Sequence, residues 1–404
     1  NNNDGPLLQA MTDQLTHRGP DAGGTWVDGE RGIGLGHRRL SIIDLSAEGA
    51  QPMHSRDERW VVVFNGEIYN HQVLREALPE ATFRGHSDTE SLIEHIAAYG
   101  VMETLDKTNG MFAFAAWDRK EQQLWLARDR IGIKPLFYGQ WRGRWVFSSE
   151  LKPLTQLPKF APKINRTALT SLLRFNYIPC PDTIYEGIFK LPPGHAICLT
   201  AEGKAQPRPW WTSWNAALEA QNNPFSGSDE QLVDALESLL LDAVKIRMAS
   251  DVPLGAFLSG GLDSSTVVAL MQAQSSRPVQ TFSIGFNEAG FNEAEHAKAI
   301  AKHLGTNHTE LYLTSKEARD VIPLIPQYWD EPFSDSSQIP TYLVSKLARQ
   351  KVTVSLSGDG GDELFCGYNR YVWANRIWSA IGKIPHLPRH AAYKVIGRTP
   401  LALF

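Results

Sequence analysis

The sequence is poor in cysteine, and it lacks both a long apolar run and an excess of basic residues. Its three cysteines, Cys180, Cys198 and Cys366, are far apart and form no Cys-x-x-Cys pair, so we expect reduced thiols and a cytoplasmic protein. No stretch approaches the ~20 apolar residues of a membrane-spanning helix, and the first residues have no signal-peptide pattern. A net charge of −4 provides no argument for nucleic-acid binding. These absences favour small-molecule partners, with no nucleic acid and no membrane.

The length and the spacing of apolar residues predict more than one domain. With 404 residues, 42% of them hydrophobic, the chain can form two or three domains with separate cores. Between residues 25 and 150, short apolar runs alternate with turns, which is typical of two stacked sheets with flanking helices. From residue 229 onward, strands alternate with helices, which predicts a doubly wound parallel sheet. We expect a linker at residues 206–228, with tryptophans that pack between the domains.

One turn in the second half has the features of a phosphate-binding loop. An apolar run ends at Leu258 and is followed by Ser259-Gly260-Gly261-Leu262-Asp263-Ser264-Ser265 and a helical pattern. Glycines allow a tight turn, while free N–H groups, serine hydroxyls and the helix N-terminus attract an anion. An ordinary Gly-Ser turn is the competing interpretation, and no Walker sequence occurs. The whole pattern predicts ATP cleaved between its α and β phosphates, with AMP transferred to a substrate and a cation held by Asp263.

Four polar clusters in the first half follow predicted strands or precede a predicted helix. They are His17-Arg18-Gly19-Pro20-Asp21, His37-Arg38-Arg39-Leu40-Ser41, Asn65-Gly66-Glu67-Ile68-Tyr69-Asn70 and Ser87-Asp88-Thr89-Glu90. A small zwitterion needs a guanidinium for its carboxylate and carboxylates for its ammonium, and Arg39, Glu67 and Asp88 are of these kinds. Asn65 and the N–H group of Gly66, where we expect a strand to end, are candidates for an oxyanion hole. Each cluster alone also fits turn chemistry or a surface ion pair; their joint occurrence favours a binding site.

A second, acidic turn supports the nucleotide interpretation. Residues 357–363, Ser-Gly-Asp-Gly-Gly-Asp-Glu, follow a predicted buried strand and place carboxylates where Mg²⁺ ligands are useful. We expect Asp263 and Asp362 to hold Mg²⁺, although a solvated acidic turn is the alternative. Two other patterns are set aside. The run Gly32-Ile33-Gly34-Leu35-Gly36 lacks dinucleotide-loop spacing, and His296, His303 and His308 share no face, so we expect surface histidines rather than a zinc site.

The motifs of both halves resemble the glutamine-hydrolysing asparagine synthetase family. The resemblance rests on the first, third and fourth polar clusters, the two turns, Gly110-Met111-Phe112-Ala113-Phe114 and Arg128-Asp129-Arg130-Ile131-Gly132. It implies a glutamine amidotransferase domain at residues 1–205, with an αββα sandwich of the N-terminal-nucleophile type, and an ATP-pyrophosphatase (PP-loop) synthetase domain at residues 229–404. The family's glutamine contacts fall on Arg39, Asn65, Gly66, Glu67 and Asp88.

The resemblance also assigns residues of the ATP site. Ser357 and Gly358 would contact ATP, with Leu258 and Ile284 beside the adenine, in addition to the residues of the glycine-serine turn. Asp359 stands where some members carry a glutamate that assists formation of the acyl-adenylate, and its side chain is one methylene shorter.

One departure from the family concerns the nucleophile. The family uses a cysteine at the mature N-terminus, whose α-amine, with a pKa of about 7.7–8.0, acts as the base. Asn1 stands here instead, so we expect the nucleophilic cysteine upstream of Asn1. The last residues carry no closing signal, so we also expect a missing C-terminal part that includes a family lysine.

The predicted function is therefore a two-site enzyme that uses glutamine and ATP to amidate a carboxylate. Aspartate is the default acceptor, and sugar uronates or other carboxylates are alternatives. A second alternative keeps the adenylation but drops glutamine, as in β-lactam synthetases and related cyclases. The last is a sensor or scaffold without activity. The family further implies an apolar ammonia tunnel, and a homodimer is one expected assembly state.

Overall fold

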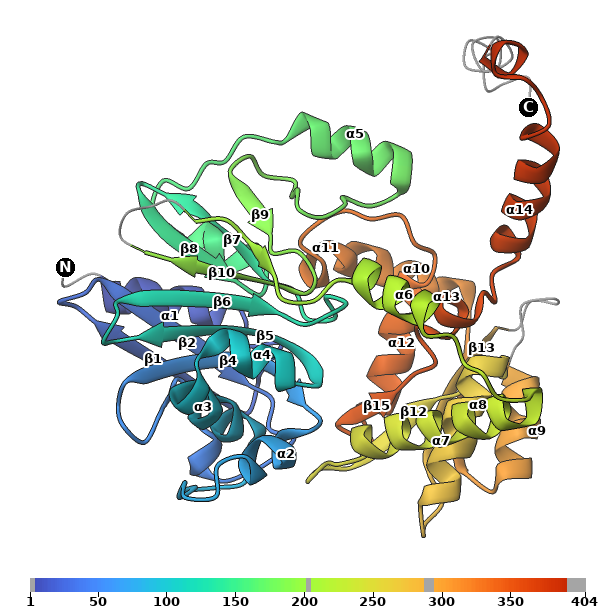
Figure 1. Cartoon of the computed structure of the whole chain (residues 1–404), viewed down its shortest axis with the longest axis horizontal. Coiled ribbons are helices and arrows are strands. Elements are labelled where there is room, and N and C mark those ends of the chain that lie inside the picture. Colours follow the sequence, from blue (N-terminus) through green and yellow to red (C-terminus); the bar gives the residue numbers. More distant parts are fainter. Residues whose placement is uncertain (1–3, 201–204, 287–293, 391–404) are drawn as a thin grey trace.

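The computed structural model describes residues 4–200, 205–286 and 294–390, and its elements form two halves that lie side by side (Figure 1). The elements up to residue 209 are α1 (Asp4–Asp13), β1 (Ala22–Asp28), β2 (Ile33–Arg39), β3 (Met53–His54), β4 (Trp60–Ile68), α2 (His71–Glu76), α3 (Asp88–Tyr99), α4 (Val101–Lys107), β5 (Gly110–Asp118), β6 (Gln123–Arg128), β7 (Phe137–Trp141), β8 (Arg144–Ser148), α5 (Arg166–Phe175), β9 (Ile188–Lys190), β10 (His195–Leu199) and β11 (Arg208–Pro209). The later elements are α6 (Ser213–Asn222), α7 (Asp229–Arg247), β12 (Leu254–Phe257), α8 (Leu262–Gln274), β13 (Gln280–Phe286), α9 (Ala294–Leu304), β14 (Asn307–Leu313), α10 (Ser315–Val321), α11 (Ile325–Tyr328), α12 (Gln338–Ala348), β15 (Val354–Leu356), α13 (Gly361–Phe365) and α14 (Asn369–Ile381).

The first half is a sandwich of antiparallel sheets between helices. Within the described residues, one sheet has the order β11-β10-β6-β5-β4-β3, and it faces the pair β1-β2 and the sheet β8-β7-β9. One apolar core joins β4 and β5 to α3 and α4, and a second core lies between the sheets. A third cluster packs α1 and the 3₁₀ turn η2 (Lys152–Gln156) on β7–β9. The predicted αββα sandwich is therefore confirmed.

Strand β4 shows why the space between the sheets turns polar at one end. Its side chains alternate, so that Val62 and Phe64 pack toward α3 while Val61 and Val63 enter the inter-sheet core. The sequence predicted that this strand ends at Asn65 and Gly66. In the structure it continues to Ile68, because its whole length pairs with β5. By the same alternation, the side chains of Asn65 and Glu67 extend the inter-sheet face beyond the apolar core.

The second half contains a parallel sheet with helices on both faces. Among the described strands the order is β14-β13-β12-β15, and all three pairings are parallel. Helices α7, α8 and α9 pack with β12 on one face, and α12 packs on the other. The chain moves from β12 outward to β13 and β14, and then returns to place β15 on the other side of β12. The predicted doubly wound sheet is confirmed, and its switch point lies between β12 and β15, where such sheets bind ligands.

Residues 206–228 are more ordered than the sequence predicted. They contain β11, which extends the first sheet, and α6. Trp210 does not pack between the halves: its indole Nε1–H donates to the Arg128 carbonyl at 3.2 Å, and its ring stacks on Phe112. Trp214 on α6 is 71% exposed.

The two halves also touch through the loop after α11. The Asp330 carboxylate accepts the N–H groups of Leu151 and Lys152, the latter at 3.0 Å, and also pairs with the Lys152 ammonium at 3.1 Å. Next to it, the Glu331 carboxylate accepts the Ile184 N–H at 2.7 Å and pairs with Lys190 at 2.6 Å.

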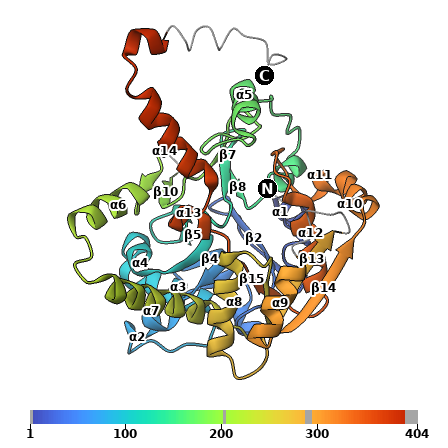
Figure 2. The ribbon, with the colours of Figure 1, turned by 90° about the vertical axis from the view of Figure 1, so that its right-hand side faces the viewer.

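Helix α14 projects away from both halves (Figure 1, Figure 2). Across the described ranges, no helix is long and apolar enough to cross a bilayer. Both chain ends and residues 201–204 and 287–293 lie outside the described residues.

Candidate active sites

A cavity of about 580 Å³ opens between the six-stranded sheet of the first half and the strands that face it, next to the polar end of β4. All five residues predicted to contact glutamine line it: Arg39, Asn65, Gly66, Glu67 and Asp88. They come from β2, β4 and the start of α3, so the fold brings together residues that are far apart in the sequence.

The N–H group of Gly66 faces away from the β4–β5 ladder. In an antiparallel pair, alternate residues direct their N–H groups to opposite sides. The N–H of Phe64 donates to the Gln51 side chain at 2.6 Å and that of Ile68 to Asp88 Oδ2 at 2.9 Å, both away from β5. The N–H of Gly66 lies between them on the same side, and among the described residues it has no hydrogen-bond partner. It is therefore available to a ligand, and any larger residue at this position would collide with the Met111 carbonyl.

Two carboxylates beside Gly66 form an acidic pair in a dry environment. Asp88 accepts the N–H groups of Ile68 and Thr89, yet burial raises its pKa to about 6 against these hydrogen bonds. Burial, and then the charge of Asp88, raises the pKa of Glu67 to about 7, while Lys134 opposes the change. Both groups would gain from a cation between them, because a positive charge favours their ionised forms.

The Arg39 guanidinium is buried and is held by a short loop. It donates to the carbonyl oxygens of Ser46 at 3.0 Å, Ile43 at 3.4 Å and Asp44. Among the described residues, the Nε–H and one Nη1–H have no partner, so the guanidinium still has a donor for a carboxylate. The Asn65 side-chain N–H donates to Ser149 Oγ at 3.4 Å, a long contact that a better acceptor can replace.

Two further residues line this cavity and were not predicted. The Lys134 ammonium is mostly buried, and burial followed by the charge of Arg18 lowers its pKa. His37 is neutral, because burial lowers its pKa to about 4; its Nε2 lies 3.0 Å from the Phe64 carbonyl, and its buried Nδ1 has no partner among the described residues. Their proximity to singled-out motifs was a signal: Lys134 follows the Arg128-to-Gly132 motif by two residues, and His37 begins the second cluster.

The second candidate site is the glycine-serine turn, residues 259–265, at the carboxyl end of β12. Gly260 has a φ of +83°, which a larger residue would adopt only with strain. The turn is braced from within, since the Ser259 N–H donates to the buried Ser264 Oγ at 3.2 Å. No side chain among the described residues caps α8, so the N–H groups of its first turn remain for an anion. Ser259 and Gly261 are exposed, so the turn is open to a ligand.

The acidic turn, residues 357–363, lies against the start of α8. A Cβ on Gly358 would sit 2.7 Å from the Ser264 nitrogen, and one on Gly361 would collide with the Asp263 carboxylate. The Asp359 carboxylate accepts the Ser357 hydroxyl at 2.9 Å. Asp362 is partly buried, and a Cβ on Gly367 would collide with its carboxylate.

The expected cation site includes Asp263, in the first turn of α8. No group of three metal-ligating side chains occurs in the described part of the chain. One or two carboxylates with phosphate oxygens suffice for Mg²⁺, and Asp263, which touches both turns, fits this requirement.

The side chains expected beside the adenine are not brought together, since Leu258 packs with α8 and α9 while Ile284 packs in the cluster of α10 and α12. His296 and His303 are exposed on α9, as expected. His308 is not a surface residue: it is half-buried, with Nδ1 2.9 Å from Thr281 Oγ1 and Nε2 3.1 Å from Ser283 Oγ.

Comparisons with known proteins bear on both sites. Residues 1–211 match the family described as glutamine amidotransferase domain, and residues 235–402 match the family described as asparagine synthase. The glutamine-hydrolysing asparagine synthetase 1 of Bacillus subtilis is 38% identical over 90% of this chain and 56% of the relative. A Methanocaldococcus jannaschii relative, provisionally named as a glutamine-hydrolysing asparagine synthetase, is 37% identical over 96% of this chain and 77% of its own length. Amidase chyE of Penicillium rubens is 32% identical over 90% of this chain and 55% of the relative. The chain thus spans little more than half the length of the Bacillus and Penicillium relatives.

Proposed function

The chain belongs to the glutamine-hydrolysing asparagine synthetase family, and from this premise we propose that it transfers the amide nitrogen of glutamine to a carboxylate activated by ATP. We assign glutamine hydrolysis to residues 1–205 and the ATP-dependent step to residues 229–404, with residues 206–228 as the connection. The observation that carries the proposal is the inter-sheet cavity, where a free N–H group, a guanidinium and two carboxylates meet.

In this proposal the cavity binds glutamine by its charged ends. Arg39 receives the α-carboxylate, and Glu67 and Asp88 receive the α-ammonium. The amide group then lies toward Asn65 and Gly66. Attack on the amide carbon places negative charge on the oxygen, and the Gly66 N–H and the Asn65 side-chain N–H donate to it. Such donors stabilise the tetrahedral intermediate before the C–N bond breaks and ammonia leaves.

The nucleophile in this proposal is a cysteine upstream of Asn1. None of the three cysteines of residues 1–404 lines the cavity. A terminal cysteine would use its own α-amine as the base and as the proton donor to the departing ammonia. N-terminal sequencing of the mature protein tests this assignment, and a mature protein without a cysteine there would contradict it.

In the second half, the glycine-serine turn and the N-terminus of α8 hold the phosphates of ATP. An oxygen of the substrate carboxylate attacks the α-phosphorus and pyrophosphate leaves; ammonia then attacks the acyl carbon and AMP leaves. Ser357 and Gly358 contact the nucleotide from the facing turn, and Asp359 assists the adenylation. The main chain at Leu258 and Ile284 would flank the adenine, because the two side chains pack on opposite faces of the sheet. Asp263, together with Asp362, would hold Mg²⁺, which when bound offsets the phosphate charge.

Aspartate is the proposed acceptor, supported by the relatives named as asparagine synthetases. Another carboxylate, such as a sugar uronate, is the alternative for the same chemistry. The cavity with all five glutamine contacts argues against a glutamine-independent cyclase and against a sensor.

The decisive assay incubates the protein with ATP, Mg²⁺ and a panel of carboxylic acids, with and without glutamine. We expect AMP and pyrophosphate with aspartate, and glutamate formation whenever glutamine is present. Another acid that supports AMP release in place of aspartate would redirect the acceptor assignment. Absence of AMP with every acid would contradict the synthetase step.

Two smaller assignments belong to the same proposal. Three free, widely spaced cysteines support a reducing, cytoplasmic setting. The homodimer stays a prediction, which light scattering of the purified protein would test.

A further inference from the structure

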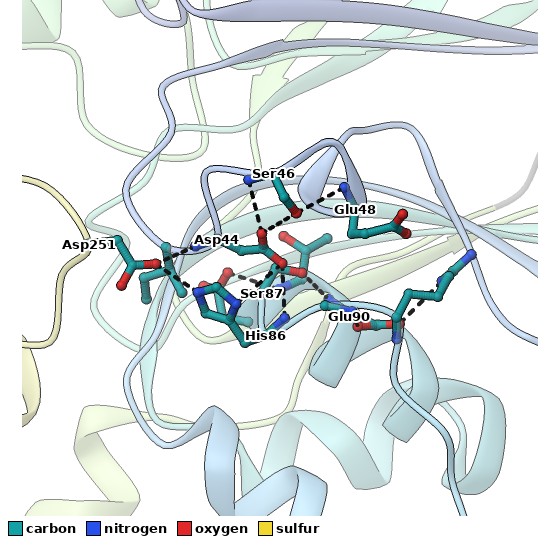
Figure 3. A network of polar contacts seen from close by, with 12 residues as sticks. Asp44, Ser46, Glu48, His86, Ser87, Glu90 and Asp251 are labelled. Atoms are coloured by element: carbon teal, nitrogen blue, oxygen red, sulfur yellow. Dashed lines mark hydrogen bonds and ion pairs between the residues drawn. The ribbon is translucent and has the colours of Figure 1, made fainter.

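A carboxylate of the second half bonds to two segments that carry the glutamine site of the first. Asp251 precedes β12 by three residues. Its Oδ2 accepts the backbone N–H of Asp44 at 2.8 Å and lies 2.8 Å from Nε2 of His86, while its own N–H donates to the Ile42 carbonyl at 3.0 Å (Figure 3). We call Asp44, His86 and Asp251 the clasp.

Each first-half member of the clasp is linked, by a hydrogen bond or by the chain, to a residue proposed to bind glutamine. The Asp44 N–H bonds to Asp251, and the carbonyl of the same residue accepts the guanidinium of Arg39. His86 lies two positions before Asp88, in the segment that starts α3. Asp251 is therefore linked to Arg39 through Asp44, and to the segment of Asp88 through His86. These are the groups proposed to hold the opposite ends of glutamine.

The clasp is braced within the first half. The buried Asp44 carboxylate accepts the N–H and hydroxyl of Ser46 at 3.1 and 2.5 Å, and the N–H of His86 at 2.9 Å (Figure 3). Asp44 also has a φ of +59°, a conformation that a non-glycine residue adopts at some cost. Because side-chain bonds hold the loop in this conformation, the position of the Arg39 carbonyl partners depends on the contacts of Asp44.

We propose that Asp251 is a positioning residue of the glutamine site, supplied by the synthetase half of the chain. This inference rests on the proposed function. By holding Asp44 and His86 together, Asp251 fixes the separation between the guanidinium and the acidic pair. Glutamine would then bind fully only when the two halves are docked.

The structure provides a matched control at another contact between the halves, in the loop after α11. Glu331 also accepts one backbone N–H and pairs with one basic side chain of the first half, but its partners are Ile184 and Lys190, which do not line the cavity. Removing Glu331 loosens the docking without touching the clasp.

The test measures binding of L-glutamate and L-glutamine by the full-length protein that contains these residues. Asp251→Ala is expected to raise the dissociation constant for L-glutamate about threefold to tenfold, because a charge-assisted bond in a part-exposed site is lost. The KM for glutamine should rise by the same factor, with a much smaller change in the kcat of glutamine hydrolysis. Asp251→Asn should restore part of the affinity, since its amide oxygen still accepts the Asp44 N–H.

Glu331→Ala is expected to leave the glutamate affinity within about twofold of wild type, because a substitution at a distant site with no shared partners acts independently of the glutamine site. Equal affinity in wild type and Asp251→Ala would overturn the proposal, as would equal losses in Asp251→Ala and Glu331→Ala. If Asp251→Ala does not fold, judged by its melting curve, Asp251→Asn takes its place. A glutamate affinity of Asp251→Asn equal to that of wild type, or a loss equal to that of Glu331→Ala, would then overturn the proposal. A wild-type protein that binds neither glutamate nor glutamine would contradict the proposed glutamine site itself, whatever the variants do.

Discussion

The two candidate sites are built from different parts of the polypeptide. The cavity of the first half is enclosed between sheets and is lined by buried charged side chains such as Arg39, Glu67 and Asp88. The candidate nucleotide site of the second half is an exposed turn in which backbone N–H groups, a helix N-terminus and close glycine contacts dominate. In the proposed function, the first site would therefore recognise its ligand by desolvated charge, and the second by main-chain geometry. Removal of a buried polar side chain should therefore weaken the first site, and an added Cβ or loss of the cation ligand should weaken the second.

The largest effect should come from Asp263, a charged side chain of the second site. Asp263→Ala is expected to lower AMP release by about 10³-fold, because a ligand for the cation that offsets phosphate charge is lost. Glutamine hydrolysis should stay near its wild-type rate. Both rates are measured on the same preparation. A parallel fall in both would show that the two sites are not separate.

In the first site, Asn65→Ala is expected to lower the rate of glutamine hydrolysis by about 10²–10³-fold, the usual effect of removing one oxyanion donor. Its KM for glutamine should change little, since the charged ends of the ligand bind elsewhere. AMP release with ammonium as the nitrogen source serves as the control and should persist. A change confined to KM would reassign Asn65 to ground-state binding.

An added methyl group tests the main-chain site. Gly260→Ala is expected to raise the KM for ATP about tenfold, because its Cβ would lie 2.8 Å from the Ala297 nitrogen and the residue would keep a φ of +83°. Gly305→Ala is the matched control, since Gly305 has a φ of +73° but open space around its Cβ position. Equal effects of the two substitutions on ATP binding would mean that backbone strain alone, rather than contact at the turn, is being measured.

The smallest effect concerns stability. The folded-state pKa of Glu67 is raised from 4.5 to about 7, so its ionisation destabilises the folded state increasingly as pH rises between these values. Glu67→Gln should therefore stabilise the protein at pH 8 by about 1–3 kcal/mol while weakening glutamine binding. Little gain is expected at pH 4.5.

Urea denaturation at both pH values checks this prediction. Asp88→Asn is the contrast, because an amide cannot accept both N–H groups that the Asp88 carboxylate accepts, and it should destabilise at pH 8. Glu67→Gln without any stability gain at pH 8 would contradict the buried charged pair.

The contrast between the sites also explains what the sequence could predict. Features that depend on residue type alone could be predicted, such as the glycine-serine turn and the clusters around Arg39, Asn65 and Asp88. Features that depend on how the strands pair could not be predicted. The freedom of the Gly66 N–H follows from the register of β4 on β5, and the sequence suggested instead that the strand ends there. Lys134 joins the cavity only because the second sheet folds over the first.

Contacts between the halves could not be predicted either, because they join segments that are far apart in the sequence. Asp251 looks like an ordinary residue before a strand until the Asp44 loop is placed against it. The segment of residues 206–228 has weak periodicity, yet β11 forms because β10 offers it an edge. His308 becomes half-buried because its neighbour strand places Thr281 and Ser283 beside it.

The loop after α11 has a consequence for dividing the protein into pieces. Asp330 and Glu331 lie in the second half of the chain, but their partners, Leu151, Lys152, Ile184 and Lys190, lie in the first. A fragment that begins after α6 would leave these acids without the groups that neutralise them. A protease that cuts the exposed stretch between α6 and α7 would instead leave a nicked protein whose two fragments elute together.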